Sequence, residues 1–291
     1  KLRKLNVEFC GKPQVEAAGL DLLKAWINRK GKRFHTPDPL RPAPKGMMLV
    51  GVPGSGKSLI AQTIGTLWNV PVLSVDMGSI YGSLVGESEA NLRRLLSTAE
   101  AIAPCVLFLD EIEKALAGVN SPGDSGVSQR LFGKLLTWMQ EKTAPVFVLA
   151  TANNIAGLPP EFTRKGRFDE IFFVDLPNPL ERKAILEAHL SRYGVAGVDI
   201  THILAATEGF SGAELAAVVE EALDLMDEDG QTTLTPDYLQ AAIKATCPLS
   251  ERNPEALANL RDWAKVSARP ATQRLESPTK PAKQGKVVML G

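Results

Sequence analysis

The sequence has few cysteines, no excess of charge and no long apolar run. Its 291 residues include only three cysteines, far apart and without a C-x-x-C pair, which argues against a disulfide framework or a zinc site and indicates free thiols in a reducing compartment. No stretch approaches the roughly 18 apolar residues of a membrane span, and residues 1–30 lack the apolar core of a signal peptide. We therefore expect no membrane span and a cytoplasmic location.

Charge is balanced overall but not locally. The 33 basic residues equal the 33 acidic ones, which argues against a protein that coats nucleic acid or an anionic membrane. Residues 1–45 hold eleven basic residues against four acidic ones, and residues 179–250 hold four against twelve. These blocks are either two solvated faces or complementary surfaces that meet between neighbouring copies.

Short apolar runs alternate with helical patterns between Gly46 and Pro177. Most runs are continuously apolar with polar ends, which is typical of strands buried on both faces. The alternation predicts a parallel sheet wrapped by helices. The predicted strands are Met47–Val50, Val70–Asp76, Cys105–Asp110, Val146–Thr151 and Ile171–Asp175. The predicted helices cover about residues 57–68, 88–102 and 128–140, and the Gly/Ser/Pro-rich segment 117–127 predicts a surface loop.

Three helix starts follow Pro177, each marked by a capping residue or a first-turn proline. They are Asn178–Glu181, Ser211–Glu214 and Thr235–Pro236. We expect from them a small helical unit over residues 179–250. The remaining sequence predicts one short helix near residues 253–266, and then a disordered basic tail.

The segment Gly51-Val-Pro-Gly-Ser-Gly-Lys-Ser58 follows an apolar strand and precedes a helix, which is the context in which a P-loop pattern is meaningful. Glycines let backbone N–H groups approach a phosphate chain, and the helix N-terminus points at the anion. Lys57 offers a charge to the outer phosphates, and Ser58 offers a hydroxyl to Mg²⁺. The segment predicts a nucleotide-phosphate site, with a ligand-free Gly-rich turn as the weaker alternative.

Two acids follow each other at the end of the predicted strand Cys105–Asp110. Asp110 can hold Mg²⁺, and Glu111 can polarise the water that attacks the γ-phosphate. A purely structural role is the weaker hypothesis, because an unpaired acid is costly to bury. The adjacent glutamate favours a hydrolase over a nucleotide-binding switch.

Two further segments carry ambiguous signals. Asn153 follows the predicted strand Val146–Thr151, where its amide can orient the lytic water or simply cap a turn. Arg164 and Arg167 lie three residues apart beside a glycine, which suits a bidentate anion contact but also a solvated basic turn. Taken alone, neither segment decides between its two interpretations.

The order and spacing of these segments resemble the AAA family of AAA+ ATPases over about residues 15–250. The resemblance identifies Gly51–Ser58 with Walker A, Leu107–Glu111 with Walker B, Asn153 with the first sensor, and Arg164 and Arg167 with the arginine fingers. It places around ATP or ADP the residues Gly19, Pro53, Gly54, Ser55, Gly56, Lys57, Ser58, Leu59, Asp110, Gly212 and Ala213, with Ser58 and Asp110 on Mg²⁺. Later segments look most like the cyanobacterial and plastid AAA proteins first named as a conserved chloroplast reading frame: Pro248–Ser250, Leu260–Ala264 and Ala268–Ala271.

The chain departs from the family pattern at the central-pore loop. The family offers an aromatic and an aliphatic residue there, whereas this sequence has Leu84 and Val85 ahead of Gly86-Glu-Ser-Glu89. An aliphatic pair grips an extended peptide less firmly than an aromatic ring. The substitution argues against firm threading of a polypeptide.

By this resemblance we expect an α/β P-loop NTPase with a parallel five-stranded sheet flanked by helices, and a small all-helical lid. The expected divisions are residues 1–178 for the nucleotide-binding domain, 179–250 for the lid, and 251–291 for a short helix and tail. The expected reaction is hydrolysis of ATP to ADP and phosphate. The resemblance assigns water activation to Glu111, water positioning to Asn153, and contact with the neighbour's γ-phosphate to Arg164 and Arg167.

The resemblance also implies a homo-oligomeric ring, expected to be a hexamer, that remodels an unidentified protein partner in the cytoplasm or the plastid stroma. A nucleotide-gated assembly scaffold, in which hydrolysis only resets the assembly, is the main alternative, and the pair Leu84 and Val85 favours it. A DNA-associated ATPase has only local basic charge in its favour, since no recognition helix or aromatic-interleaved basic stretch is evident.

Overall fold

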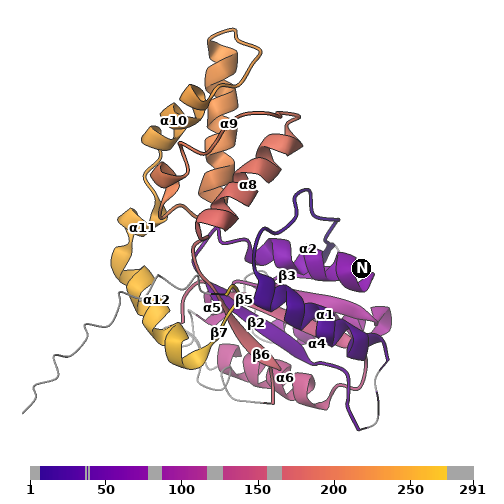
Figure 1. Ribbon diagram of the computed structural model, residues 1–291. Coiled ribbons are helices and arrows are strands. Elements are labelled where there is room, and N and C mark those ends of the chain that lie inside the picture. Colours follow the sequence, from indigo (N-terminus) through magenta and orange to yellow (C-terminus); the bar gives the residue numbers. More distant parts are fainter. Residues whose placement is uncertain are drawn as a thin grey trace, which may run out of the picture.

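The computed structural model of the protein describes residues 7–36, 38, 40–77, 87–116, 127–155 and 166–273. These residues form an α/β unit and a helical unit, stacked one on the other, with the C-terminal helices running along one side of both (Figure 1). The predicted loop over residues 117–127 lies outside the described residues except for Val127, and the predicted tail is described as far as residue 273.

A mostly parallel sheet of seven strands forms the centre of the α/β unit. The strands are β1 (Val7–Phe9), β2 (Gly46–Gly51), β3 (Val72–Asp76), β4 (Cys105–Asp110), β5 (Val146–Ala152), β6 (Glu170–Val174) and β7 (Arg269–Pro270). Their order across the sheet is β1-β3-β4-β5-β2-β6-β7. The five predicted strands are confirmed as the parallel inner strands, and two short edge strands extend the expected five-stranded sheet. Of these, β1 pairs antiparallel with β3, and β7 pairs parallel with β6.

Helices cover both faces of the sheet. One face carries α1 (Asp21–His35) and α2 (Lys57–Trp68), and the other carries α4 (Glu87–Ile102), α5 (Ile112–Leu116), α6 (Val127–Glu141) and α12 (Pro254–Ser267). The first face is rich in aromatic contacts: the Phe34 and Trp68 rings stack with centroids 4.9 Å apart, and Phe147 meets Trp68 edge-on at 4.8 Å. Because both faces are covered, most residues of the inner strands are buried, as the continuous apolar runs predicted, and residues such as Ser74, Asp110 and Ile171 are half-buried.

The helical unit, called the lid below, has its own hydrophobic core. It consists of α8 (Pro179–Arg192), a 3-10 turn (Ala205–Thr207), α9 (Gly212–Glu228) and α10 (Pro236–Ala245). Asn178 and Ser211 cap α8 and α9 through complete capping boxes with Glu181 and Glu214, as the sequence predicted. Because the lid has a core of its own, it forms a separate layer, which lies at the carboxyl ends of the parallel strands (Figure 1).

The C-terminal extension is more ordered than the sequence predicted. Where one short helix is expected, α11 (Leu249–Arg252) precedes α12, and β7 then adds a strand to the sheet. Helix α12 buries Leu257, Leu260 and Ala264 against the α/β core. The extension thus belongs to the packed fold as far as residue 273. No helix in the described part of the chain is long and apolar enough to cross a membrane.

Candidate functional site

The P-loop connects β2 to α2 and shapes an open cradle. Gly54 and Gly56 have φ values of 73° and 85°, in the left-handed region that glycine adopts without steric cost. The N-cap residue of α2 is Gly56, so no side chain caps the start of this helix. A Cβ built on Gly56 would meet no atom within 4 Å. The first turn of α2 therefore presents backbone N–H groups and the positive end of its dipole to the cavity, an arrangement suited to an anion.

Lys57 lies in this cradle and is only 6% exposed. Its Nζ donates hydrogen bonds to the carbonyl oxygens of Gly51 and Val52 at 3.0 and 2.7 Å. Burial lowers the pKa of Lys57 to about 8, although the Asp110 carboxylate acts in the opposite direction. The Ser55 hydroxyl is a third, longer partner at 3.4 Å, and a buried ammonium group held by neutral oxygens is incompletely compensated. An anion bound beside Lys57 would compensate the charge of its ammonium group.

A chain of hydrogen bonds fixes the acidic end of β4. The Thr151 hydroxyl, at the end of the neighbouring strand β5, donates to Asp110 Oδ1 and accepts from the Glu111 backbone N–H at 2.9 Å. Ser58 Oγ lies 3.5 Å from the other oxygen, Asp110 Oδ2. Glu111 has φ of 48°, which costs conformational energy in a non-glycine residue and often marks functional sites. Strand pairing and the Thr151 hydrogen bonds together hold two carboxylates beside the P-loop and keep Glu111 in its strained conformation.

Asn153 contacts both acids that follow the strand. Its Nδ2 donates to Glu111 Oε1 at 2.7 Å, and its backbone N–H donates to Glu113 Oε1 at 2.9 Å. Glu111 also forms an ion pair with the exposed Lys114. Burial raises the pKa of Glu113, and its Oε2 and Asn153 Oδ1 are buried without a hydrogen-bond partner among the described residues. Sequence reasoning missed Glu113, because a carboxylate in the first turn of a helix is ordinary.

The lid touches the P-loop directly. Ala213, in the first turn of α9, donates its backbone N–H to the Gly54 carbonyl at 2.9 Å. A Cβ on Gly54 would come within 2.9 Å of the Ala213 side chain, and one on Gly212 within 3.2 Å of the Gly54 carbonyl. Glycine is thus required at Gly54, whose φ is positive, and a side chain at Gly212 would fit only if the P-loop backbone shifted slightly. The structure brings Gly212 and Ala213 to the P-loop, as the resemblance implied.

The candidate site is a cavity of about 440 Å³ between the P-loop and the lid. Apart from Gly19, every residue placed by the resemblance at the nucleotide lines it, together with Glu111 and Asn153. Gly19 lies in the turn between the lining residues Ala18 and Leu20. The lining residues that sequence reasoning missed are Ile185, Ala188 and His189 on α8, and Val15, Glu16, Ala17 and Ala216. Helix α8 gave no signal beyond its apolar periodicity. Burial lowers the pKa of His189.

Of the four remaining predicted site residues, the structure describes Arg167 alone. Leu84, Val85 and Arg164 fall outside the described residues. Arg167 is described and precedes β6, so it lies toward the amino end of a parallel strand, whereas Gly51 and Asp110 end their strands at the opposite edge. Arg167 does not line the cavity of its own chain.

Comparisons with known proteins agree with this geometry. Residues 47–176 match the AAA family, the ATPase family associated with various cellular activities, and residues 197–241 match the AAA+ lid domain. The AAA domain-containing protein ycf46 of Pyropia yezoensis is 44% identical over 86% of this chain and 51% of its own length, and that of Guillardia theta is 41% identical over 86% and 50%. The chain spans about half the length of these curated relatives.

Solved structures show the same fold. The FIGL-1 AAA domain superposes with a TM-score of 0.73 at 23% identity, over 90% of this chain and 92% of that one. The FIGL-1 AAA domain in complex with ADP gives 0.72 at 25%, over 90% and 93%. The P-loop, the acidic strand end and the lid contact occur here in one cavity, and the family and lid matches follow the same order along the sequence. The chain therefore contains a domain of the AAA family of ATPases, followed by an AAA+ lid domain.

Proposed function

We propose that this chain is the motor part of a ring-forming ATPase that uses ATP hydrolysis to remodel a protein partner. The observation that carries the proposal is the Glu111 carboxylate, which is held by Asn153 beside the buried Lys57. A site for nucleotide binding alone has no need of a second, strained carboxylate. The similar FIGL-1 domain in complex with ADP supports a nucleotide in this cavity.

The phosphate end of the cavity suits Mg²⁺ and a triphosphate. Backbone N–H groups around Gly54 and Gly56 would cradle the phosphates, with Lys57 on the outer ones. Ser58 and Asp110 would hold Mg²⁺, their oxygens lying 3.5 Å apart. No group of three or more potential metal-binding side chains occurs in the part of the chain that the structure describes, which fits an ion that takes most of its ligands from phosphate and water. The ion would neutralise charge on the phosphates.

The water-activating end is formed by Glu111 and Asn153. Glu111 would accept a proton from water as the water oxygen attacks the γ-phosphorus and the bond to the ADP oxygen breaks, and the proton would then pass to the released phosphate. The buried, unpartnered Asn153 Oδ1 would accept a hydrogen bond from that water. The Asn153 amide group would therefore position both the base and the nucleophile.

The nucleoside end lies between the lid and the N-terminal turn. Gly212 and Ala213 would contact base and ribose, and Gly19 would flank the base. Pro53, Ser55 and Leu59 complete the lining of the cavity on the P-loop side. From α8, Ile185 adds an apolar side chain to the wall of the cavity and His189 adds an imidazole ring. Because these groups come from both layers, nucleotide would hold the lid against the P-loop.

The balance of charge supports a ring. Lys57 is the only lysine or arginine among the described residues that line the cavity, which also contains Asp110 and Glu111. Charge that develops on the γ-phosphate would need further cations, and the family supplies them from the neighbouring subunit. Arg164 and Arg167 would take this role, worth roughly 10³ to 10⁵ in rate. Leu84 and Val85 would face the central pore and contact the partner.

Steady-state phosphate release across a protein dilution series tests the proposal. Specific activity should rise with protein concentration, because a complete site needs two subunits. Glu111→Gln and Arg167→Ala should each be nearly inactive, and mixing them should restore part of the rate through interfaces that pair an intact Arg167 with an intact Glu111. Glu187→Gln, an exposed change on α8, is the matched control and should keep the rate.

Two results would contradict parts of this proposal, and a third would require another variant. An activity that is independent of concentration, together with no rescue on mixing, would remove the contribution of the neighbouring subunit. A pull-down with Glu111→Gln tests whether the ring holds a protein partner. If mixing rescues hydrolysis but this pull-down captures no protein, the nucleotide-gated scaffold is favoured. Loss of the fold in Arg167→Ala, seen as a lowered melting temperature, would require Arg167→Lys as the test variant.

A further inference from the structure

Helix α1 begins with an unusual turn at the edge of the nucleotide cavity. Gly19 and Leu20 have φ values of 62° and 58°, two consecutive residues in the left-handed region, and α1 has no side-chain cap. A leucine in this conformation is strained, so contacts from elsewhere in the chain must hold the turn. Leu20 lines the cavity, and the contacts that hold it therefore shape the site.

The first of these contacts comes from the lid. Glu181, the third residue of α8, is 8% exposed, and its Oε1 accepts a hydrogen bond from the Leu20 backbone N–H at 3.2 Å. Its Oε2 accepts from the Asn178 backbone N–H at 2.9 Å and so completes the cap of α8. A Cβ on Gly19 would lie 1.9 Å from Oε1, so this carboxylate requires glycine in the turn.

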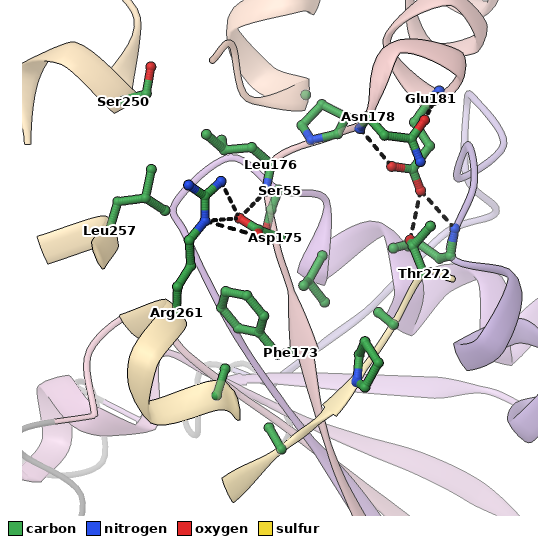
Figure 2. A pocket seen from close by; sticks show the side chains of 18 of the residues that line it. Ser55, Phe173, Asp175, Leu176, Asn178, Glu181, Ser250, Leu257, Arg261 and Thr272 are labelled. Atoms are coloured by element: carbon green, nitrogen blue, oxygen red, sulfur yellow. Dashed lines mark hydrogen bonds and ion pairs between the residues drawn. The ribbon is translucent and has the colours of Figure 1, made fainter. Parts of the chain in front are cut away.

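The second contact comes from the C-terminal extension. Thr272 donates its hydroxyl to the same Glu181 Oε1 at 2.7 Å, as Figure 2 shows. The preceding residue, Ala271, is 1% exposed, and its carbonyl accepts from the backbone N–H of Leu23 in the first turn of α1 at 3.0 Å. A backbone carbonyl from the far end of the chain thus replaces the missing side-chain cap.

The C-terminal extension is itself anchored to both layers. Arg261 on α12 forms a bidentate contact with Asp175, just after β6, through Nε at 3.0 Å from each carboxylate oxygen (Figure 2). Arg252 on α11 contacts Glu214 of the lid at 2.7 Å. A groove of about 1260 Å³ runs between these helices and the strand end and adjoins the nucleotide cavity. Thr272 is therefore presented to Glu181 by a fixed element.

We propose that Glu181 and Thr272 are positioning residues for the nucleoside end of the ATP site. Thr272 orients the Glu181 carboxylate, the carboxylate holds the Leu20 N–H, and the turn at Gly19 and Leu20 is thereby kept against the base. The inference rests on the proposed placement of the nucleotide. It makes the C-terminal extension, which lies outside the matched AAA and lid segments, a determinant of nucleotide affinity.

Calorimetric titration of Thr272→Val and Thr272→Ser tests the proposal. The two ligands are Mg²⁺-ADP and Mg²⁺ with inorganic triphosphate, which has no nucleoside. Valine keeps the shape of the side chain and loses the hydroxyl, whereas serine retains it. We expect Thr272→Val to raise the Kd for ADP about three- to tenfold, the effect of one hydrogen bond. The Kd for inorganic triphosphate should stay unchanged, and Thr272→Ser should bind ADP as the parent chain does.

Equal ADP affinity in the parent chain and Thr272→Val would overturn the inference, and so would an equal loss for both ligands, which indicates general destabilisation. A parent chain that binds no ADP would instead overturn the proposed function.

A measurement on the unaltered chain covers the case in which the valine variant does not fold. ADP should slow hydrogen exchange at the amides of Leu20, Leu23 and Ala271, because coupling between two sites is reciprocal. Triphosphate should not slow it. Unchanged exchange at these amides with ADP would also overturn the inference.

Discussion

Replacing Lys57 by methionine should abolish nucleotide binding and yet stabilise the ligand-free fold at neutral pH. Lys57 is 6% exposed and has the carbonyl groups of Gly51 and Val52 as partners. Its pKa falls from 10.5 to about 8 on burial, which corresponds to a cost of roughly 3 kcal/mol at pH 7. Loss of the two hydrogen bonds to the carbonyl oxygens offsets about 2 kcal/mol. We therefore expect the free energy of unfolding to rise by about 1 kcal/mol.

The effect should depend on pH in a defined direction. Between pH 8 and 10.5 the unfolded chain binds more protons at Lys57 than the folded chain, so the free energy of unfolding of the parent protein rises with pH across this interval. Lys57→Met lacks the group and lacks this rise. The advantage of the variant should be complete below pH 8 and should shrink toward pH 10.5.

Urea denaturation of the two proteins at neutral pH and near pH 9.5, each with and without Mg²⁺-ADP, measures both effects. Other titrating groups are common to both proteins and cancel in the difference. Lys244→Met, an exposed change on α10, is the control and should alter stability by less than about 0.5 kcal/mol. ADP should stabilise only the proteins that keep Lys57. A variant less stable than the parent at neutral pH, or a difference that stays constant with pH, would refute the reasoning.

Three further outcomes follow from the geometry. Asn153→Ala should slow hydrolysis by roughly 10²-fold while ATP binding persists, which phosphate release and a binding titration would separate; equal loss of both would contradict this. Thr151→Val removes the hydrogen-bond partner of Asp110 Oδ1 and of the Glu111 backbone N–H, and should lower stability by about 1 to 3 kcal/mol and raise the Mg²⁺ concentration needed for half-maximal rate. Leu260→Ala on α12 should cost about 2 to 4 kcal/mol in denaturant unfolding, whereas Val266→Ala, on the same helix and 87% exposed, should cost almost nothing.

The inner part of the fold was predictable because its signals are local. Five continuous apolar runs became the five inner parallel strands, and a P-loop pattern between a strand and a helix became the cradle around Lys57. The capping boxes at Asn178 and Ser211 marked the starts of two lid helices to the residue. In each case the residues that form the feature lie within one turn or one strand of each other.

The edges of the fold were not predictable, because partners far along the chain create them. Strand β7 has two residues and exists only because Phe172 pairs with Arg269. Helix α1 starts at Asp21, its N-cap residue Leu20 has no side-chain capping bond, and the carbonyl that caps it comes from Ala271. Glu181 was expected as the capping-box partner of Asn178, and nothing local indicated that its other oxygen reaches Leu20.

The two ends of the cavity therefore differ in how they are built, and they should differ in how they respond to change. The phosphate end is formed by short contiguous segments around Lys57, Asp110 and Asn153, each with a direct contact to another lining residue, so a single substitution there removes a chemical step. The nucleoside end is assembled from the N-terminal turn, the lid and the C-terminal extension, which meet at the Glu181 carboxylate. A contact shared among three segments adjusts when one of them changes, so substitutions at this end should alter affinity by small factors. The C-terminal extension can then tune nucleotide binding while the residues proposed for hydrolysis remain unchanged.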